Sequence, residues 1–198
     1  MRKLLLFIFY FFLLNSPTFA LIEVDITRGN LNPLPIAVSP FYVESGSKDI
    51  KENDKVIKNI GEEIAKIIEV NFKRSGLFNP LKKDSFVQNP DIAHVKPRFE
   101  DWRLIKAQAL VTGKVSVLEN RLRTEFRLWD VVAAKEMVAV AFSTTPDNWR
   151  RVAHMISDKI YQRLTGEDGY FDTRIIYVSE TGPKTQRYKK LAIMDQDG

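Results

Sequence analysis

The side chains that could do chemistry in this sequence are few. Only two histidines, His94 and His154, and no cysteine occur among its 198 residues. A zinc site would therefore have to use these histidines together with carboxylates, and His154 has no second ligand at the spacing that metal sites use. We expect both histidines to be structural residues. No metal ion and no cofactor is predicted.

Other catalytic patterns are equally weak. Ser39 and Ser75 lack the glycines of a nucleophile elbow. The stretch TGKVS at residues 112–116 resembles part of a phosphate-binding loop, but it lacks the upstream glycine and falls inside a predicted strand. The adjacent carboxylates Glu62 and Glu63 fall on the polar side of a helical pattern. The sequence therefore predicts no catalytic residue.

Basic residues alternate along one predicted strand, residues 121–131. Arg121, Arg123 and Arg127 share a face with Glu125. This face could bind an acidic polymer, or it could be the solvated side of a sheet, where alternating charge keeps an exposed strand soluble. The pattern favours the solvated side, and no nucleic-acid partner is predicted.

The first twenty residues have the composition of a secretory signal peptide. Arg2 and Lys3 precede an apolar run of eleven residues at 4–14, and Pro17 and Ala20 follow. A membrane-spanning helix needs about 20 apolar residues, so this run is too short for one. We predict cleavage after Ala20 and a mature chain without a membrane span. Removing two of the 30 basic residues leaves 28 against 25 acidic ones, a net charge of +3.

The mature chain would begin with an alternating segment, Leu21–Thr27. Its residues are Leu21, Ile22, Glu23, Val24, Asp25, Ile26 and Thr27. The period of two places apolar side chains on one face and carboxylates on the other, which is typical of a half-buried strand. Such a strand can be the edge of its own sheet, or it can extend the sheet of another protein through main-chain hydrogen bonds. The pattern leaves both open.

The elements that must position these residues can be predicted from hydrophobic periodicity. Residues 35–41 form a short apolar strand with prolines at its margins. Residues 54–76 predict a long helix that is capped by Asn53 or Asp54, buries a stripe starting at Ile57, and ends at Gly76. The other predicted elements are a short helix within 97–108, three strands at 109–118, 121–131 and 136–144, and a helix at 145–166. The strand at 136–144 is apolar on both faces, which favours a central position in the sheet.

This order predicts an α/β fold in which a mixed β-sheet packs against two main helices. We expect the domain to span residues 21–165 and a turn-rich linker to follow at 166–173. Residues 174–198 then predict a hairpin of two apolar strands. The last two residues, Asp197 and Gly198, are a turn signal that normally stands between two strands.

Five stretches of the sequence carry a resemblance to a known family: PLPIAVSPF, NFKRSGLFNPL, ALVTGKVSV, RVAHMISDKIYQRLTGEDGYFDTRIIYVSETG and KKLAIMDQDG. Together they resemble the TolB family, whose members are the periplasmic component of the bacterial Tol-Pal envelope system. The resemblance implies an N-terminal α/β domain followed by a six-bladed β-propeller. Residues 174–198 look like an incomplete first blade, so the chain is expected to be truncated.

The resemblance also implies a function. Members of this family are non-enzymatic adaptors that link inner-membrane TolA to outer-membrane Pal, for outer-membrane constriction at cell division and for envelope integrity. The family binds TolA through its mature N-terminal segment, which here is Leu21–Thr27, and it binds Pal through the propeller, which has no counterpart here. Two other classes stay open: an exported polyanion-binding domain that uses the arginine face, and an exported hydrolase with a catalytic domain downstream.

Overall fold

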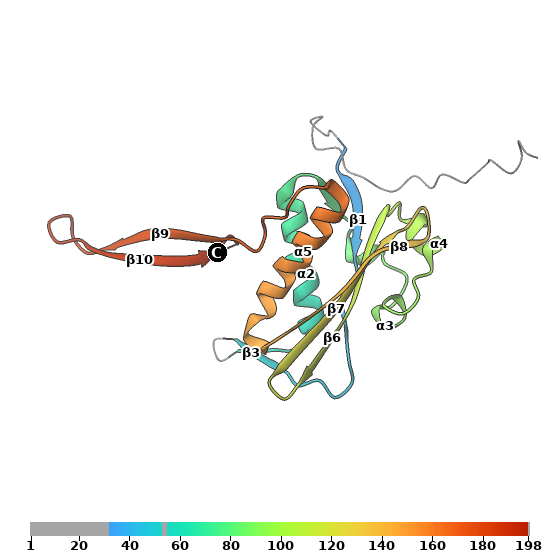
Figure 1. Ribbon diagram of the computed structural model, residues 1–198, viewed down its shortest axis with the longest axis horizontal. Coiled ribbons are helices and arrows are strands. Elements are labelled where there is room, and N and C mark those ends of the chain that lie inside the picture. The colour runs from blue at the N-terminus through green and yellow to red at the C-terminus, as the bar shows by residue number, and fades with distance from the viewer. Residues whose placement is uncertain (1–31, 53–54, 198) are drawn as a thin grey trace, which may run out of the picture.

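The computed structural model describes residues 32–52 and 55–197. The predicted signal peptide and the segment Leu21–Thr27 lie outside this range. Figure 1 shows a twisted sheet with two long helices on one face and a two-stranded hairpin that projects away from the helices. The predicted fold class, a mixed sheet packed with two main helices, is confirmed.

The sheet combines a parallel part with an antiparallel part. Its strands are, in spatial order, β5 (Phe78–Pro80), β1 (Leu34–Val38), β6 (Ala109–Leu118), β7 (Arg121–Asp130) and β8 (Lys135–Thr144), with β2 (Tyr42–Val43) also beside β6. Strand β1 runs parallel to both of its neighbours, whereas β6, β7 and β8 form an antiparallel meander. Strand β1 is buried on both faces, as its continuous apolar run predicts.

Helix α2 (Ile60–Ser75) is shorter at its start than the sequence predicts. Asn59 caps it by accepting a hydrogen bond from the amide of Glu62, and Gly76 ends it in the left-handed conformation with φ +72°. The predicted caps, Asn53 and Asp54, and the inclusion of Ile57 in the helical stripe were wrong. Residues Lys55–Ile57 instead form strand β4, which pairs with β3 (Ile50–Glu52). The asparagine nearest the helix supplies the oxygen that the first free amides need.

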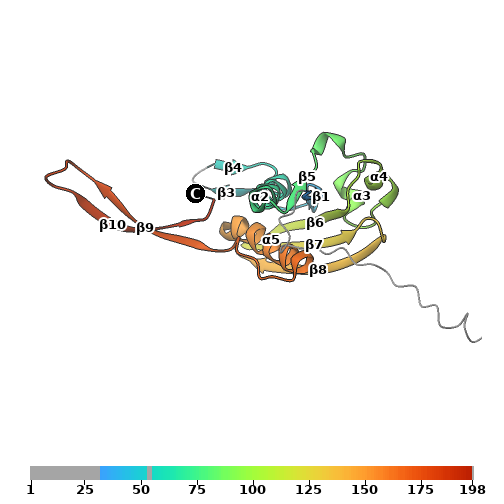
Figure 2. The same ribbon diagram turned by 90° about the horizontal axis from the view of Figure 1, so that it is seen from above.

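Helix α5 (Trp149–Thr165) lies beside α2 on the same face of the sheet (Figure 2). A 3-10 turn, Pro146–Asn148, leads into it, and Gly166 ends it with φ +77°. The predicted buried stripe is confirmed, with the members Trp149, Val152, Ala153, Ile156, Ile160 and Leu164. The main core therefore lies between these two helices and the sheet.

The opposite face of the sheet is covered at one end by two short helices, α3 (Pro90–Ala93) and α4 (Phe99–Leu104). A 3-10 turn, Lys83–Ser85, precedes them. Trp102 is 1% exposed and forms the centre of a second, smaller core. Its indole Nε1 donates to Gln88 at 3.1 Å, so the buried polar atom is satisfied.

Strand β8 lies at the edge of the sheet, which corrects its predicted central position. Its apolar side chains alternate between half-buried and exposed, and Phe142 stacks on Phe126 with ring centroids 6.3 Å apart. The outward positions include Ala139 and Ala141, and because alanine is apolar the sequence predicted that this face is buried as well. An exposed alanine costs little, so the apolar composition of one strand does not fix its place in the sheet.

The C-terminal strands β9 (Arg174–Thr181) and β10 (Tyr188–Asp195) pair along their whole length and extend away from the helices (Figures 1 and 2). Residues 166–173, which the sequence predicts to be a linker, place Phe171 in the main core with no exposed surface.

No helix in the described part of the chain is long and apolar enough to cross a membrane.

Candidate functional site

The predicted TolA-binding residues, Leu21–Thr27, lie outside the described residues, so their role stays a prediction. The structure does show the element to which this segment leads. Leu34 begins β1, which is held between β5 and β6 and is therefore an interior strand. Residues 28–33 separate the predicted site from this rigid part of the sheet.

The arginine face of β7 is a solvated surface with internal ion pairs, as predicted. Arg123 Nε lies 2.9 Å from Glu125 Oε1, and Arg127 Nε lies 3.5 Å from Glu136 Oε2. The hydrogen bond from Arg123 lowers the pKa of the Glu125 carboxyl below its ordinary value. These arginines already have carboxylate partners, which reduces the positive charge that a polyanion would meet.

A shallow pocket of about 220 Å³ opens on this face, between the sheet and the short helices. His94 lies at its border, where its ring stacks on Tyr42 at 4.7 Å with an interplanar angle of 7°. The Nδ1 atom of His94 also donates to the carbonyl of Pro90 at 3.1 Å. These contacts give His94 a structural role, as the sequence predicts.

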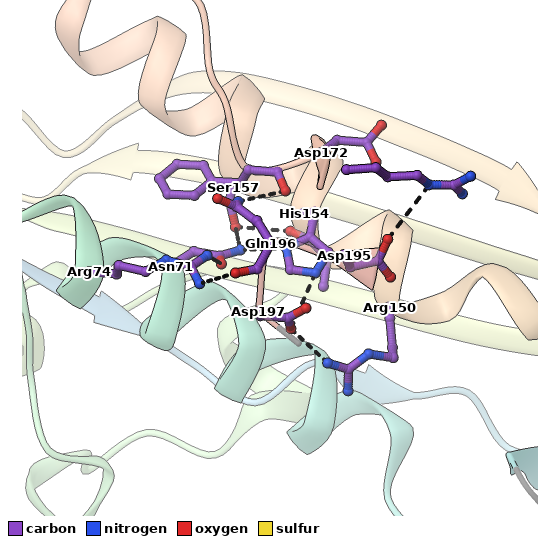
Figure 3. A network of polar contacts seen from close by, with 12 residues as sticks. Asn71, Arg74, Arg150, His154, Ser157, Asp172, Asp195, Gln196 and Asp197 are labelled. Carbon is purple, nitrogen blue, oxygen red and sulfur yellow. Dashed lines mark hydrogen bonds and ion pairs between the residues drawn. The ribbon is translucent and has the colours of Figure 1, made fainter. Parts of the chain in front are cut away.

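The second histidine lies on the helical side, inside a polar network that joins α2, α5 and the end of the described chain (Figure 3). His154 is 2% exposed. Asn71 on α2 places its amide Nδ2 at 3.0 Å from His154 Nδ1 and 2.9 Å from Ser157 Oγ. Because Asn71 Nδ2 is a donor, the Nδ1 atom of His154 accepts, and the ring proton resides on Nε2.

The other side of His154 faces Asp197, in the turn after β10. The Nε2 atom lies 3.4 Å from Asp197 Oδ2, and Arg150 Nη2 lies 2.6 Å from the same oxygen. Burial lowers the pKa of His154 below its ordinary value, although the Asp197 carboxylate acts in the opposite direction. The histidine is therefore neutral at pH 7, and its Nε2 atom faces the Asp197 carboxylate without a hydrogen-bond partner among the described residues.

Sequence reasoning identified His154 as a structural residue but did not find its partners. Asn71 and His154 are 83 positions apart, and no spacing pattern in the sequence connects them. The network also offers no metal site, because no group of three or more His, Asp or Glu residues in the described ranges could hold an ion. Its chemistry is that of a buried hydrogen-bond network with one titratable member.

Comparisons with known proteins match both the sequence and the fold. A family model for the TolB amino-terminal domain matches residues 22–137. The Tol-Pal system protein TolB of Pelagibacter ubique (strain HTCC1062) is 65% identical over 191 residues, which are 95% of this chain and 42% of that protein. The crystal structure of TolB from Acinetobacter baumannii superposes with a TM-score of 0.66 and 25% identity, covering 84% of this chain and 37% of that one. The chain thus spans less than half the length of these two relatives, and it belongs to the family of the TolB amino-terminal domain.

Proposed function

We propose that this chain is exported to the periplasm and acts there as a non-enzymatic adaptor of the Tol-Pal system, linking inner-membrane TolA to outer-membrane Pal. Its role would be in outer-membrane constriction at cell division and in envelope integrity. The observation that carries the proposal is the family match, which begins at Ile22, within the predicted TolA-binding segment, and continues through most of the α/β domain. In this proposal, Pal is bound by the propeller of the longer family members.

The proposed TolA contact is strand addition by Leu21–Thr27. Main-chain hydrogen bonds to an edge strand of TolA would supply affinity, and Ile22, Val24 and Ile26 would fill alternate pockets on one face. The interior strand β1 supports the proposal, because it gives the segment a firm anchor at Leu34. We expect modest affinity, since ordering a segment on binding offsets part of the gain.

The test is a calorimetric titration of residues 21–198 with the C-terminal domain of TolA. Deleting Leu21–Thr27 is expected to abolish binding and to leave the far-ultraviolet circular dichroism largely unchanged. Val24→Pro is expected to act in the same way, because it removes a main-chain donor together with a side-chain anchor. Undiminished binding by the deletion variant would place the contact elsewhere and refute the proposal.

A matched control comes from the arginine face. Arg123→Gln combined with Arg127→Gln is expected to leave TolA binding almost unchanged, because these side chains pair within their own sheet. The polyanion-binding alternative predicts the reverse: the double variant would lose binding to heparin, and that binding would fall steeply with salt. The deletion of Leu21–Thr27 and the double arginine variant therefore distinguish TolA binding from polyanion binding.

A further inference from the structure

Strand β8 offers an unpaired side to any further strand. Among the described residues it pairs with β7 on one side and with no strand on the other. Natural proteins usually protect a long edge strand with charges, proline or a bulge, because its free amides and carbonyls can bind another strand. Lys135, Glu136 and a bulge near Met137 do this at the start of β8, but residues 138–144 carry neither charge nor proline and pair with β7 in unbroken register. This part of the edge is therefore open to strand addition.

Two pockets open beside this edge, on the helical face of the sheet where α5 lies (Figure 2). Both are lined by Phe142 on β8 and by Met155 on α5, which are half-buried. The pocket nearer the start of α5 has a volume of about 220 Å³, and the other has about 410 Å³. The carboxylates of the larger pocket, Asp158 and Asp168, already accept hydrogen bonds from within the chain. An added strand would place every second side chain on this face, roughly 7 Å apart, so two neighbouring apolar side chains can enter the two pockets.

The other face of the added strand would lie beside basic side chains. On that face β8 presents Ala139 and Ser143, which pair with Arg127 and Arg123 on β7. Beside these small neighbours both arginine side chains stay about half exposed, at 43% and 54%. Their ion pairs within the sheet are exposed and contribute little to stability, so a carboxylate on the added strand can join them. A segment that alternates apolar and acidic side chains is therefore complementary to both faces of the edge.

We propose that the free edge of β8, together with the two pockets beside α5, binds an extended segment of another protein that alternates apolar and acidic side chains. The segment adds a strand to β8, places its apolar side chains against Phe142 and Met155, and directs its carboxylates toward Arg123 and Arg127. Main-chain hydrogen bonds supply the affinity, and the alternate side chains supply the specificity. This site is independent of the proposed TolA contact, which uses residues 21–27.

A second copy of this chain fits the edge less well. A twofold pairing of two β8 strands about Phe142 would place both α5 helices on the same face of the joined sheet. Because α5 carries Arg151, Met155 and Lys159 on the side of the pockets, Arg151 of one helix would then approach Lys159 of the other. Like charges brought together at an interface cost affinity. A separate partner with carboxylates avoids this repulsion.

Nuclear magnetic resonance of residues 21–198 can test the site with a heptapeptide that alternates valine with glutamate and has both ends blocked. Binding is expected to slow hydrogen exchange at every second amide of residues 138–144, because an added strand bonds only to alternate residues of an edge. A peptide of the same composition in which the valines are consecutive should bind at least about tenfold more weakly, since it cannot turn all of them to one face. The proposal would be overturned by failure of the alternating peptide to bind, by equal binding of both peptides, or by protection of β9 or β10 in place of β8.

Two single variants test whether the pockets take part in binding. Met155→Glu places a carboxylate between the two pockets and should weaken binding of the alternating peptide at least about tenfold. Val70→Glu makes the same kind of change on α2, at a side chain that is 49% exposed and lies outside both pockets, and it should leave binding unchanged. Equal affinities of the two variants would contradict the assignment of the pockets and overturn the proposal. An unshifted Trp102 indole signal would show that each variant is folded.

Two other occupants of the edge would give different results. A second copy would protect residues 138–144 without peptide, and the protection would rise with protein concentration. The chain's own Leu21–Thr27 would protect them at every concentration, and only the variant that lacks this segment would take up the peptide. Either result would assign the edge to this chain itself and overturn the proposal of a separate partner.

Discussion

Truncating Phe171 to alanine tests whether the α/β domain extends beyond its last long helix. The side chain has no exposed surface and belongs to the main core, although it comes from a turn-rich segment that the sequence predicts to be a linker. Its ring lies 5.7 Å from that of Tyr161 on α5 and 6.4 Å from that of Phe72 on α2, both in edge-to-face arrangements. It therefore bridges the two helices near their C-terminal ends.

The expected cost follows from this burial. Replacing a fully buried phenylalanine by alanine typically costs about 3–5 kcal/mol, because both the transfer free energy and the contacts around the new cavity are lost. A chain of this size loses roughly 2–4 °C of melting temperature per kcal/mol. Phe171→Ala should therefore lower the melting temperature by roughly 6–20 °C.

Thermal melts followed by circular dichroism provide the measurement. Tyr177→Ala is the matched control, since it removes another aromatic ring from the C-terminal segment, but one that is 42% exposed on β9. Its cost should stay below about 1 kcal/mol. If both variants melt within a degree or two of the wild type, the contacts of Phe171 do not contribute to stability and residues 166–173 behave as a linker.

Two further changes test the main core. Ile64→Asp should unfold the domain, because Ile64 is fully buried and an unpaired charge there costs several kcal/mol out of a typical total of 5–15, whereas the melting temperature of Glu63→Ala should barely change. Gly61→Ala should lower the urea midpoint, because a Cβ atom would lie 2.0 Å from the carbonyl oxygen of Phe41 and the overpacking of about 1–3 kcal/mol exceeds the gain in helix propensity. Equal melting temperatures for the first pair, or a raised midpoint for Gly61→Ala, would contradict these assignments.

The elements that could be predicted from the sequence are those with a regular hydrophobic periodicity and clear capping residues at their ends. Helix α5 has both, since a regular apolar stripe runs from Trp149 to Leu164 and Gly166 follows it. The start of α2 was misplaced because Ile57 continues the helical spacing by chance. What decides its place is a local antiparallel pairing, that of Ile57 with Ile50 between β4 and β3, which the helical spacing of the isoleucines concealed.

Some of the candidate sites could be judged from the sequence, and one could not. His94 and the arginine face could be judged from composition, because isolated histidines and alternating charges have ordinary structural explanations. The network around His154 could not, because its partners come from α2 and from the turn after β10, and each is an unremarkable polar residue in its own segment. Only the fold brings them together.

The interior position of β1 has a consequence for how the domain folds. Strands β6, β7 and β8 follow one another through short turns, so they can pair as soon as they are made, with little loss of chain entropy. Strand β1 precedes them, yet Ile36 pairs with Ala109, so its closure must wait for a long stretch of chain. The pairing of β1 with β6 is therefore expected to cost more chain entropy than the turns of the meander, and to form after them in refolding.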